Sequence, residues 1–302
     1  MAAVTPYAIG IDVGGTNIKL AAVTMDGMLL SQSQQRTDET EANWAERVRS
    51  AIDAVQTERG QPAGYIGLAA PGLVARDGRS IAWMQGRMES LQGLDWTAFL
   101  GATRVIPVLN DAHAALMGEA WKGATAGCRN VVMLTLGTGV GGGAIVDGRL
   151  LRGAIGRAGH VGHMSLDPDG SPDITGAPGS LEDAIGDCTL PRRSDGQFSS
   201  TADLVKAYLE GTSEAADIWL KSVKALAAGI VSLINLYDPE VVILGGGIVN
   251  AGPALFEPLQ VFVDGFEWRP TGDRVRIVRA QLGEMAGAWG AAANALNVYE
   301  ES

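Results

Sequence analysis

Two segments of the chain repeat one order of parts: an apolar strand, a glycine-rich turn, a second apolar strand and an Asp-Gly turn. In the first segment, residues 9–27, the turn is Gly14-Gly15-Thr16-Asn17, and in the second, residues 131–148, it is Gly137-Thr138-Gly139. Apolar runs broken at such turns predict β-hairpins. Two matching hairpins so far apart are not a short-period repeat, and they predict two related α/β halves.

The glycines of these turns suit phosphate binding. Without a Cβ, backbone N–H groups can approach an anion closely, and Thr16, Asn17 and Lys19 add donors or positive charge. Asp12, at the entrance to the first turn, can organise a magnesium ion through water. Two plainer interpretations stay open. Either segment alone is also typical of an ordinary glycine hairpin, and Lys19 can simply extend from a half-buried strand into solvent.

Composition limits the partners of the chain. Its 302 residues are 46% hydrophobic, enough for two ordinary domains or one large one. The formal net charge of −11 disfavours DNA, RNA or an anionic membrane, so backbone donors and metal must hold any phosphate ligand. We find no secretory signal and no apolar run of transmembrane length, and Cys128 and Cys188 are too few for a disulfide framework. The sequence predicts a cytoplasmic protein that binds neither nucleic acid nor membrane.

The rest of the chain alternates predicted strands and helices. We expect strands at residues 8–12, 18–24, 27–34, 65–70, 105–109, 131–136, 144–146, 241–244 and 274–278, and helices at residues 41–59, 112–122, 213–237 and 287–298. Residues 152–199 form a long, irregular, polar stretch, and such a stretch usually carries function or structure of its own. Asn110 and Asp111 follow a predicted strand directly, and ligands of open α/β sheets gather outside strand carboxyl ends.

Taken together, these motifs resemble the ROK family of sugar kinases and repressors, within the sugar kinase/actin/heat-shock chaperone superfamily. Six segments carry the resemblance, in the family's order and over nearly the whole chain: Ile11-Asp12-Val13-Gly14-Gly15-Thr16-Asn17, Ala70-Pro71-Gly72, Leu109-Asn110-Asp111-Ala112, the run from Leu136 to Gly143, Gly159-His160-Val161-Gly162-His163-Met164 and Leu244-Gly245-Gly246-Gly247. The resemblance implies two actin-like (ribonuclease H-like) α/β domains with a cleft between them. We expect the smaller domain at residues 1–112 plus 287–302 and the larger at residues 113–286.

The same resemblance implies a glucokinase-like enzyme that uses ATP and Mg²⁺ to phosphorylate a hexose or a modified hexose, at the 6-hydroxyl. It also implies a homodimer. The alternative is a sugar-binding ROK protein with lost or weak kinase activity, against which the intact Asp12 and Asp111 argue. A ROK repressor is not expected, because a basic DNA-binding segment would have to precede the first glycine motif. A dinucleotide-dependent oxidoreductase is not expected either, because its glycines open a helix, whereas these lead into strands.

Asp111 is the predicted catalytic base. Phosphoryl transfer needs an attacking hydroxyl held in line with the γ-phosphate and a group that accepts its proton. The resemblance gives Asp111 this role and assigns Asn110 and Gly72 to the sugar. A helix N-cap is the competing interpretation of Asn110-Asp111, since both residue types are preferred there.

The predicted nucleotide site draws on all three glycine turns. By resemblance, Asp12 holds magnesium through water and the last turn lies on the adenosine side. The residues assigned to the nucleotide are Asp12, Gly14, Gly15, Thr16, Asn17, Gly137, Thr138, Gly139, Gly245, Gly246 and Gly247.

The region around His163 departs from the family pattern. His163 matches a histidine beside the sugar that in many members also binds zinc, together with three cysteines downstream. Here Asp173, Thr175 and Ser180 stand at those cysteine positions, and a structural zinc site needs soft thiolate ligands. We therefore predict no zinc, a loop ordered by hydrogen bonds and packing, and a helix beginning at Leu181 with Ser180 as its cap.

Two further residues bear on the sugar. Glu182 aligns with a glutamate at the sugar's anomeric end, although an acid in a first helical turn is also favoured by the helix dipole. His160 replaces a family glutamate that accepts hydrogen bonds from sugar hydroxyls, and a neutral imidazole must donate at one of its nitrogens. An amino, epimeric or otherwise altered hexose therefore fits at least as well as glucose. Trp83, in the segment Trp83-Met84-Gln85, either stacks on the sugar or packs in the core.

Overall fold

The computed structural model describes residues 5–36, 44–84 and 88–297, and the chain forms two compact units. The first unit comprises Met1–Cys128, Gly148–Ala158 and Gln281–Ser302, and the second comprises Arg129–Asp147 and Gly159–Ala280. The units differ from the predicted domain bounds, because residues 113–128, 148–158 and 281–286 belong to the first unit.

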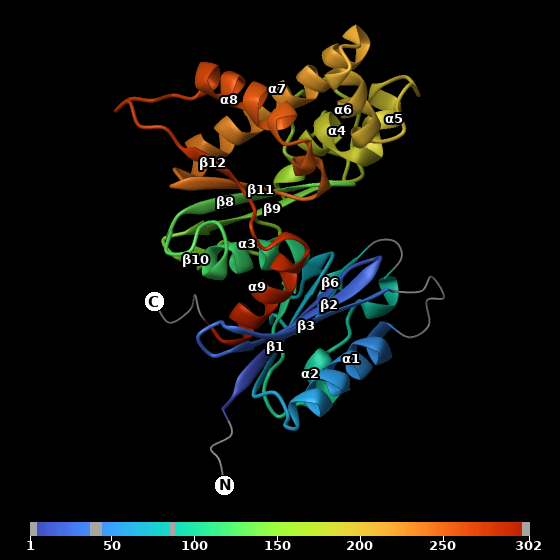
Figure 1. The fold of residues 1–302 in the computed structure, drawn as a ribbon, viewed down its shortest axis with the longest axis vertical. Coiled ribbons are helices and arrows are strands. Elements are labelled where there is room, and N and C mark those ends of the chain that lie inside the picture. Colours follow the sequence, from blue (N-terminus) through green and yellow to red (C-terminus); the bar gives the residue numbers. More distant parts are fainter. Residues whose placement is uncertain (1–4, 37–43, 85–87, 298–302) are drawn as a thin grey trace. The chain divides into compact units, whose positions relative to one another are not determined.

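The first unit is built on a five-stranded mixed sheet (Figure 1). The strand order is β3-β2-β1-β4-β7, with β1 antiparallel to β2, β2 antiparallel to β3, and β1, β4 and β7 parallel. Its strands are β1 (Tyr7–Val13), β2 (Asn17–Thr24), β3 (Leu29–Arg36), β4 (Tyr65–Ala70) and β7 (Val108–Asn110), and a small ladder joins β5 (Leu73–Val74) to β6 (Ile81–Trp83). Its helices are α1 (Trp44–Arg59), the short η1 (Glu89–Leu91), α2 (Trp96–Leu100), α3 (Asp111–Lys122), the short η5 (Gly283–Met285) and α9 (Ala286–Ala295).

The two faces of this sheet pack against different helices. Alternate residues of β1, such as Ile9 and Ile11, join a large core with Trp44 and Val48 of α1. The opposite face presents Ala8 and strand glycines to α9, and Figure 1 shows α9 lying beside β1 and α3. A Cβ on Gly10 would collide with the α9 backbone, so this helix sits unusually close to the sheet.

A buried carboxylate ties α3 to the chain just before α9. The Glu119 side chain is fully buried and accepts hydrogen bonds from the backbone N–H groups of Gln281 at 2.8 Å and Leu282 at 2.6 Å. It also accepts from Ala124 at 2.8 Å. Such charge-assisted bonds satisfy a buried carboxylate, and they explain why residues 113–128 and 281–286 belong to one unit.

The second unit repeats the plan of the first. Its strands have the order β9-β8-β11-β12, with β8 antiparallel to β9 and β8, β11 and β12 parallel. They are β8 (Val131–Leu136), β9 (Val140–Val146), β11 (Val241–Gly245) and β12 (Arg276–Arg279), whereas the residues of β10 (Arg149–Leu150) belong to the first unit. The long helices α7 (Ser213–Tyr237) and α8 (Pro253–Phe266) pack against each other. The matching strand orders confirm the predicted pair of related α/β halves.

Five short helical elements lie between β10 and α7: η2 (Val161–His163), α4 (Leu181–Ile185), η3 (Asp187–Thr189), α5 (Leu190–Arg193) and α6 (Thr201–Leu209). A further short helix, η4 (Gly247–Ala251), follows β11. Ser180 caps α4 by accepting a hydrogen bond from the Asp183 N–H at 3.2 Å, as predicted.

Several predicted bounds need correction. The strand expected at residues 105–109 is Val108–Asn110, because Val105 is exposed and Pro107 has no N–H for a ladder. The last strand begins at Arg276 rather than Arg274. Strand β9 starts at Val140 rather than at residue 144, and it includes Gly141, Gly142 and Gly143. Residues 41–43 of the first predicted helix, Gln85, and residue 298 of the last predicted helix lie outside the described residues.

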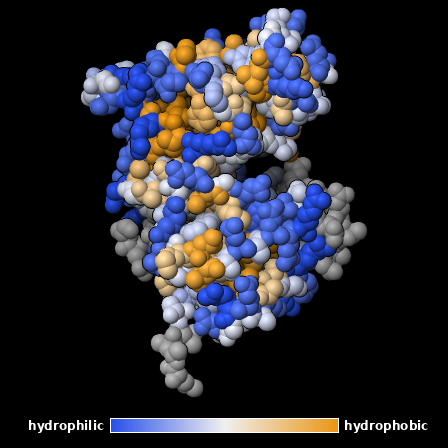
Figure 2. Space-filling model, viewed as in Figure 1, coloured by the Kyte–Doolittle hydropathy of each residue, from blue (hydrophilic) through white to orange (hydrophobic). Residues whose placement is uncertain are grey.

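The visible surface is largely hydrophilic, with apolar residues gathered in smaller patches on both units (Figure 2). Within the described residues, no helix has the length and apolar character needed to cross a bilayer.

Candidate functional site

Two carboxylates lie at one edge of the first unit's sheet. Asp12 is the second-last residue of β1, and Asp111 begins α3 directly after β7. Because β1 and β7 both run parallel to β4, their carboxyl ends share that edge. Burial raises the pKa of the Asp12 carboxyl to about 7, the negative charge of Asp111 adds to the rise, and Lys19 opposes it. A cation at this edge would relieve the repulsion, so the pair fits a magnesium ion.

The N-cap residue of helix α3 is Asn110 rather than Asp111. The Asn110 side-chain oxygen accepts from the N–H groups of Ala112 at 3.0 Å and His113 at 3.3 Å. Its amide nitrogen donates to the Gly72 carbonyl at 3.2 Å, which joins two residues assigned to the sugar. Asp111 is half-buried and bonds to the Ala112 N–H at 2.9 Å. The capping interpretation thus applies to the amide of Asn110 rather than to the Asp111 carboxylate.

The first glycine turn has open space beside it. The Gly14 N–H donates to the Asn17 carbonyl at 2.9 Å and closes a tight turn between β1 and β2. A Cβ on Gly15 would meet no atom within 4 Å, and the Thr16 side chain is exposed. Lys19 faces this region from β2, 3.7 Å from the Glu284 carboxylate, with its side chain 18% exposed. The turn can therefore admit a ligand close to its backbone.

The second glycine turn is held by the segment around α4. Within it, the Gly137 N–H bonds to the Gly139 carbonyl at 3.0 Å. The carbonyls of Gly137 and Thr138 accept from Asp187 at 3.0 Å and Cys188 at 2.9 Å. A Cβ on Gly137 would meet open space, as at Gly15. This turn is therefore open on one side and anchored on the other.

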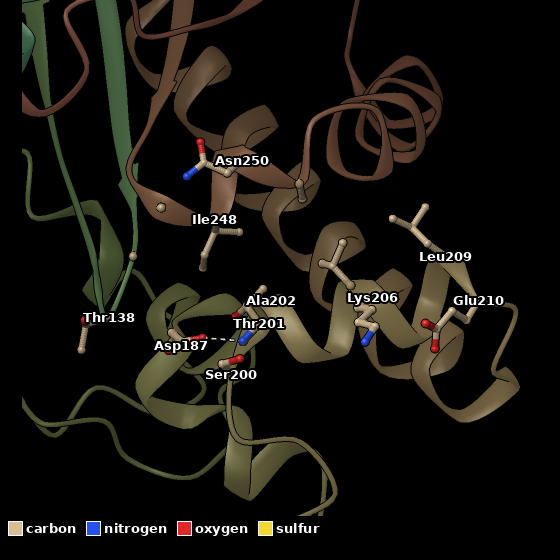
Figure 3. Close-up of a pocket in the computed structure, with 14 residues that line it drawn as sticks. Thr138, Asp187, Ser200, Thr201, Ala202, Lys206, Leu209, Glu210, Ile248 and Asn250 are labelled. Carbon is tan, nitrogen blue, oxygen red and sulfur yellow. Dashed lines mark hydrogen bonds between the residues drawn. The ribbon is translucent and has the colours of Figure 1, made fainter.

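A pocket of about 670 Å³ opens beside the second turn (Figure 3). Apolar and small side chains from α6 and η4 line it, with a few polar groups among them. The lining residues include Gly137, Thr138, Asp187, Ser200, Thr201, Lys206, Glu210, Gly247, Ile248 and Asn250. Figure 3 shows Asp187 bonded to Thr201, where the Asp187 carboxylate accepts the backbone N–H at 2.6 Å. An apolar pocket with a few convergent polar groups is the usual form of a small-molecule site.

The pocket brings together two of the predicted nucleotide turns, since Gly137, Thr138 and Gly247 all line it. Gly245 and Gly246 do not. A Cβ on Gly245 would meet Met133, and Gly246 has a φ of 89° and lies against the backbone of Leu136. These two glycines allow the backbone to turn. The lining residues on α6 were not predicted, because the sequence analysis assigned no helix or strand to residues 200–212.

The predicted sugar residues of the second unit lie in the irregular stretch of residues 152–199. Glu182 is in α4, and its Oε2 accepts the Val140 N–H at 2.9 Å, directly beside Gly139. Its carboxylate therefore contacts the end of the second glycine turn. His160 is half-buried just before η2, and His163 ends η2 with its Nδ1 2.8 Å from the Asp173 carboxylate.

His113 and Trp83 differ in their burial. His113 is buried and its Nε2 is 2.9 Å from the Ala158 carbonyl, within the first unit. Trp83 is 50% exposed, so it does not pack in the core. Among the residues that the structure describes, no group of three or more His, Cys, Asp or Glu side chains is arranged to hold a metal.

Comparison with known proteins agrees with the motifs. A model of the ROK family matches residues 8–298. The glucokinase of Thermotoga maritima is 33% identical over an alignment that covers 94% of this chain and 95% of the relative. The structure of a ROK hexokinase from Thermus thermophilus has a TM-score of 0.84 at 30% identity, covering 98% of this chain and 100% of the other. That of a ROK family glucokinase from Streptomyces griseus, in complex with glucose and AMPPNP, has a TM-score of 0.73 at 29% identity, covering 96% and 99%. The predicted fold class, two actin-like α/β domains, is confirmed, and the chain belongs to the ROK family.

Proposed function

We propose that this ROK protein, an ATP-dependent sugar kinase, transfers the γ-phosphate of ATP to the 6-hydroxyl of a hexose or a modified hexose. The observation that carries the proposal is the interacting carboxylate pair, Asp12 and Asp111, at the carboxyl edge of the first unit's parallel strands. Phosphoryl transfer needs these two chemical parts: a base for the attacking hydroxyl and a negative group for a metal.

Asp111 accepts the proton of the attacking hydroxyl in this proposal. Its position at the first residue of α3 fixes its backbone, and the cap made by Asn110 keeps that helix end in place. Asn110 and Gly72 are bonded to each other, so they present one rigid surface to the sugar. Removing a well-placed general base costs about 10²- to 10⁴-fold in rate.

Asp12 is the residue that would hold magnesium, through water. When bound, the ion neutralises charge on the phosphates, and it would also offset the repulsion that raises the pKa of Asp12. Lys19, on the strand facing Asp12, contributes positive charge to the same edge.

The nucleotide is assigned to the glycine turns. Open space beside Gly15 and Gly137 suits close approach of phosphate oxygens to backbone N–H groups, and the pocket between η4 and α6 suits a nucleoside. In this proposal Gly14, Gly15, Thr16, Asn17, Gly137, Thr138 and Gly139 serve the phosphates, and Gly245, Gly246 and Gly247 the adenosine side. The glucokinase solved with AMPPNP supports ATP as the donor.

The sugar is assigned to Asn110, Gly72, His160, His163 and Glu182. We keep the prediction that His160 changes the reading of the sugar's 2- and 3-positions, since an imidazole donates where a carboxylate would only accept. A homodimer, a cytoplasmic location and the absence of zinc also stay predictions.

A coupled ADP-release screen tests this function. Purified protein with ATP and Mg²⁺ is offered hexoses, amino hexoses, epimers and disaccharides, and the product of the best substrate is identified by ³¹P and ¹³C NMR. We expect turnover with at least one hexose or hexose derivative and phosphate on carbon 6. Phosphate on another carbon would contradict the regiochemistry. Saturable sugar binding without ADP release would contradict the kinase and favour the sugar-binding alternative.

Replacing His160 by Glu tests the specificity argument. We expect the order of preferred sugars in the screen to change, because a carboxylate accepts at both oxygens. An unchanged order would contradict the role given to His160.

A further inference from the structure

His163 is held by a buried carboxylate. Its Nδ1 lies 2.8 Å from Oδ2 of Asp173, whose side chain is only 1% exposed, whereas the His163 side chain is 28% exposed. Both residues belong to the second unit, ten positions apart, on the stretch that includes the predicted sugar residues. One edge of this imidazole is therefore fixed by protein while part of the ring remains accessible.

The two oxygens of Asp173 have separate partners. Oδ1 accepts from the Thr175 N–H and the Thr175 hydroxyl, both at 2.8 Å, and from the Ala177 N–H at 3.1 Å. The backbone of the loop also closes on itself, since the Asp173 N–H donates to the Ala177 carbonyl at 2.9 Å. Oδ2 bonds to His163. The Ser180 side chain also hydrogen-bonds this carboxylate. The loop thus folds around Oδ1, and Oδ2 faces the histidine.

These donors keep Asp173 ionised. Burial opposes ionisation, but the hydrogen bonds from His163, Thr175 and Ser180 outweigh it and hold the pKa of this carboxyl well below its usual range. An ionised carboxylate can only accept, so the proton in the Asp173–His163 bond belongs to Nδ1. In a neutral imidazole the remaining nitrogen, Nε2, is then an acceptor.

We propose that Asp173 is a positioning residue that fixes His163 as the Nδ1–H tautomer, so that Nε2 accepts a hydrogen bond from a hydroxyl of the substrate. The identity of that substrate rests on the proposed function. The tautomer itself rests only on contacts within the second unit.

Asp173→Asn is the decisive variant. Three loop donors meet Oδ1, so the amide oxygen should take that side and the amide nitrogen should face His163. An amide N–H donates, so His163 Nδ1 would have to accept and its proton would move to Nε2. The substitution thus exchanges the tautomers while it changes the shape of the side chain very little.

Long-range ¹H–¹⁵N NMR reads the tautomer directly, and the chain has only 3 histidines to assign. At pH 8.5 we expect protonated Nδ1 in the wild type and protonated Nε2 in Asp173→Asn. The KM for the sugar should rise tenfold or more, with kcat and the KM for ATP changed less than about twofold, because a single acceptor to the sugar is lost.

Thr175→Ala is the matched control. It removes one donor to Oδ1 and leaves the Oδ2–His163 bond, so the tautomer and the sugar KM should stay as in the wild type. Thermal unfolding of both variants shows whether they remain folded.

Wild-type protein with protonated Nε2 would overturn the proposal without any variant. So would an Asp173→Asn protein that keeps the wild-type tautomer or the wild-type sugar KM. A wild type with protonated Nδ1 that phosphorylates no sugar would support the Asp173–His163 assignment and contradict the proposed function, which separates the two failures.

Discussion

The two glycine turns share one strand plan but have different surroundings. The first, Gly14–Asn17, adjoins two interacting carboxylates and Lys19. The second, Gly137–Gly139, adjoins a largely apolar pocket. It is anchored by Glu182, Asp187 and Cys188, which belong to the irregular stretch of residues 152–199. The shared strand plan therefore sets the backbone of both turns, whereas the residues around each turn set its chemistry. We assign reacting charge to the first turn and nucleotide recognition to the second.

The largest difference between the turns should show in pH dependence. The folded-state pKa of Asp12 is about 7, above the value of 3.8 expected for an unfolded chain. As pH rises from about 4 to 7 the unfolded state ionises first, so the carboxyl group destabilises the fold progressively and the penalty is constant above 7. Below pH 4 both states are protonated and the penalty vanishes.

Asp12→Asn should remove this penalty in metal-free protein. At pH 8 the variant should be more stable than the wild type by up to about 4 kcal/mol, and near pH 4 the two should be equal. Urea unfolding in EDTA at both pH values measures it. A gain that is the same at both pH values would contradict a charge origin.

Substitutions at Gly15 and Gly137 should weaken ATP binding without affecting folding. A Cβ fits the empty space at Gly137 or Gly15, so Gly137→Ala and Gly15→Ala should change stability by less than about 1 kcal/mol. The added methyl group would occupy space assigned to phosphate and raise the KM for ATP roughly tenfold, a loss of about 1.4 kcal/mol.

Gly246→Ala is the contrasting variant. Its φ of 89° and its contact with the Leu136 backbone leave no room for a side chain, so it should destabilise the fold by about 1–3 kcal/mol. Thermal unfolding and ATP kinetics, measured on the three variants, would distinguish a loss of ATP binding from a loss of stability. A normal ATP KM in Gly137→Ala would remove the second turn from the phosphate assignment.

The anchor of the second turn should have a smaller effect. In Glu182→Gln a neutral amide replaces the carboxylate that accepts the Val140 N–H, which should cost about 1 kcal/mol of stability and raise the ATP KM a few-fold. Asp183→Asn is the control, since its carboxylate pairs with Arg192 at 2.7 Å instead. Equal ATP kinetics in the two variants would contradict an anchoring role.

Zinc should have no effect. At the positions where the family has cysteines, this chain has side chains with oxygen donors. The Asp173 carboxylate already accepts hydrogen bonds from its loop and from His163. Elemental analysis of purified protein should find well under one zinc per chain, and a zinc-selective chelator should leave activity with Mg²⁺ unchanged. Stoichiometric zinc would contradict the prediction.

Local signals in the sequence were sufficient for much of the fold. The matching hairpins predicted both sheets, the apolar spacing predicted the helix Ser213–Tyr237, and the hydroxyl of Ser180 predicted a cap. Each of these depends on neighbours in the chain. The strand expected from Val105 begins only at Val108, because Pro107 has no N–H for the ladder even though Ile106 beside it is buried.

Contacts between distant residues could not be predicted in this way. Glu119 bonds to backbone more than one hundred residues away, and no local pattern indicates that partner. The place of the α6 residues in the pocket depends on how the chain between β10 and α7 folds. Asp173 did carry a signal, since an aspartate two residues before Thr175 is typical of a turn stabilised by its side chain, but its bond to His163 needed the structure.

The role of Asp111 is the most direct test of the account. With the sugar found in the screen, kcat of Asp111→Asn should fall about 10²- to 10⁴-fold while its fold and sugar binding persist. Asp53→Asn, a substitution at an exposed position of α1, should behave as the wild type. Turnover by Asp111→Asn equal to that of Asp53→Asn would contradict the assignment of the base.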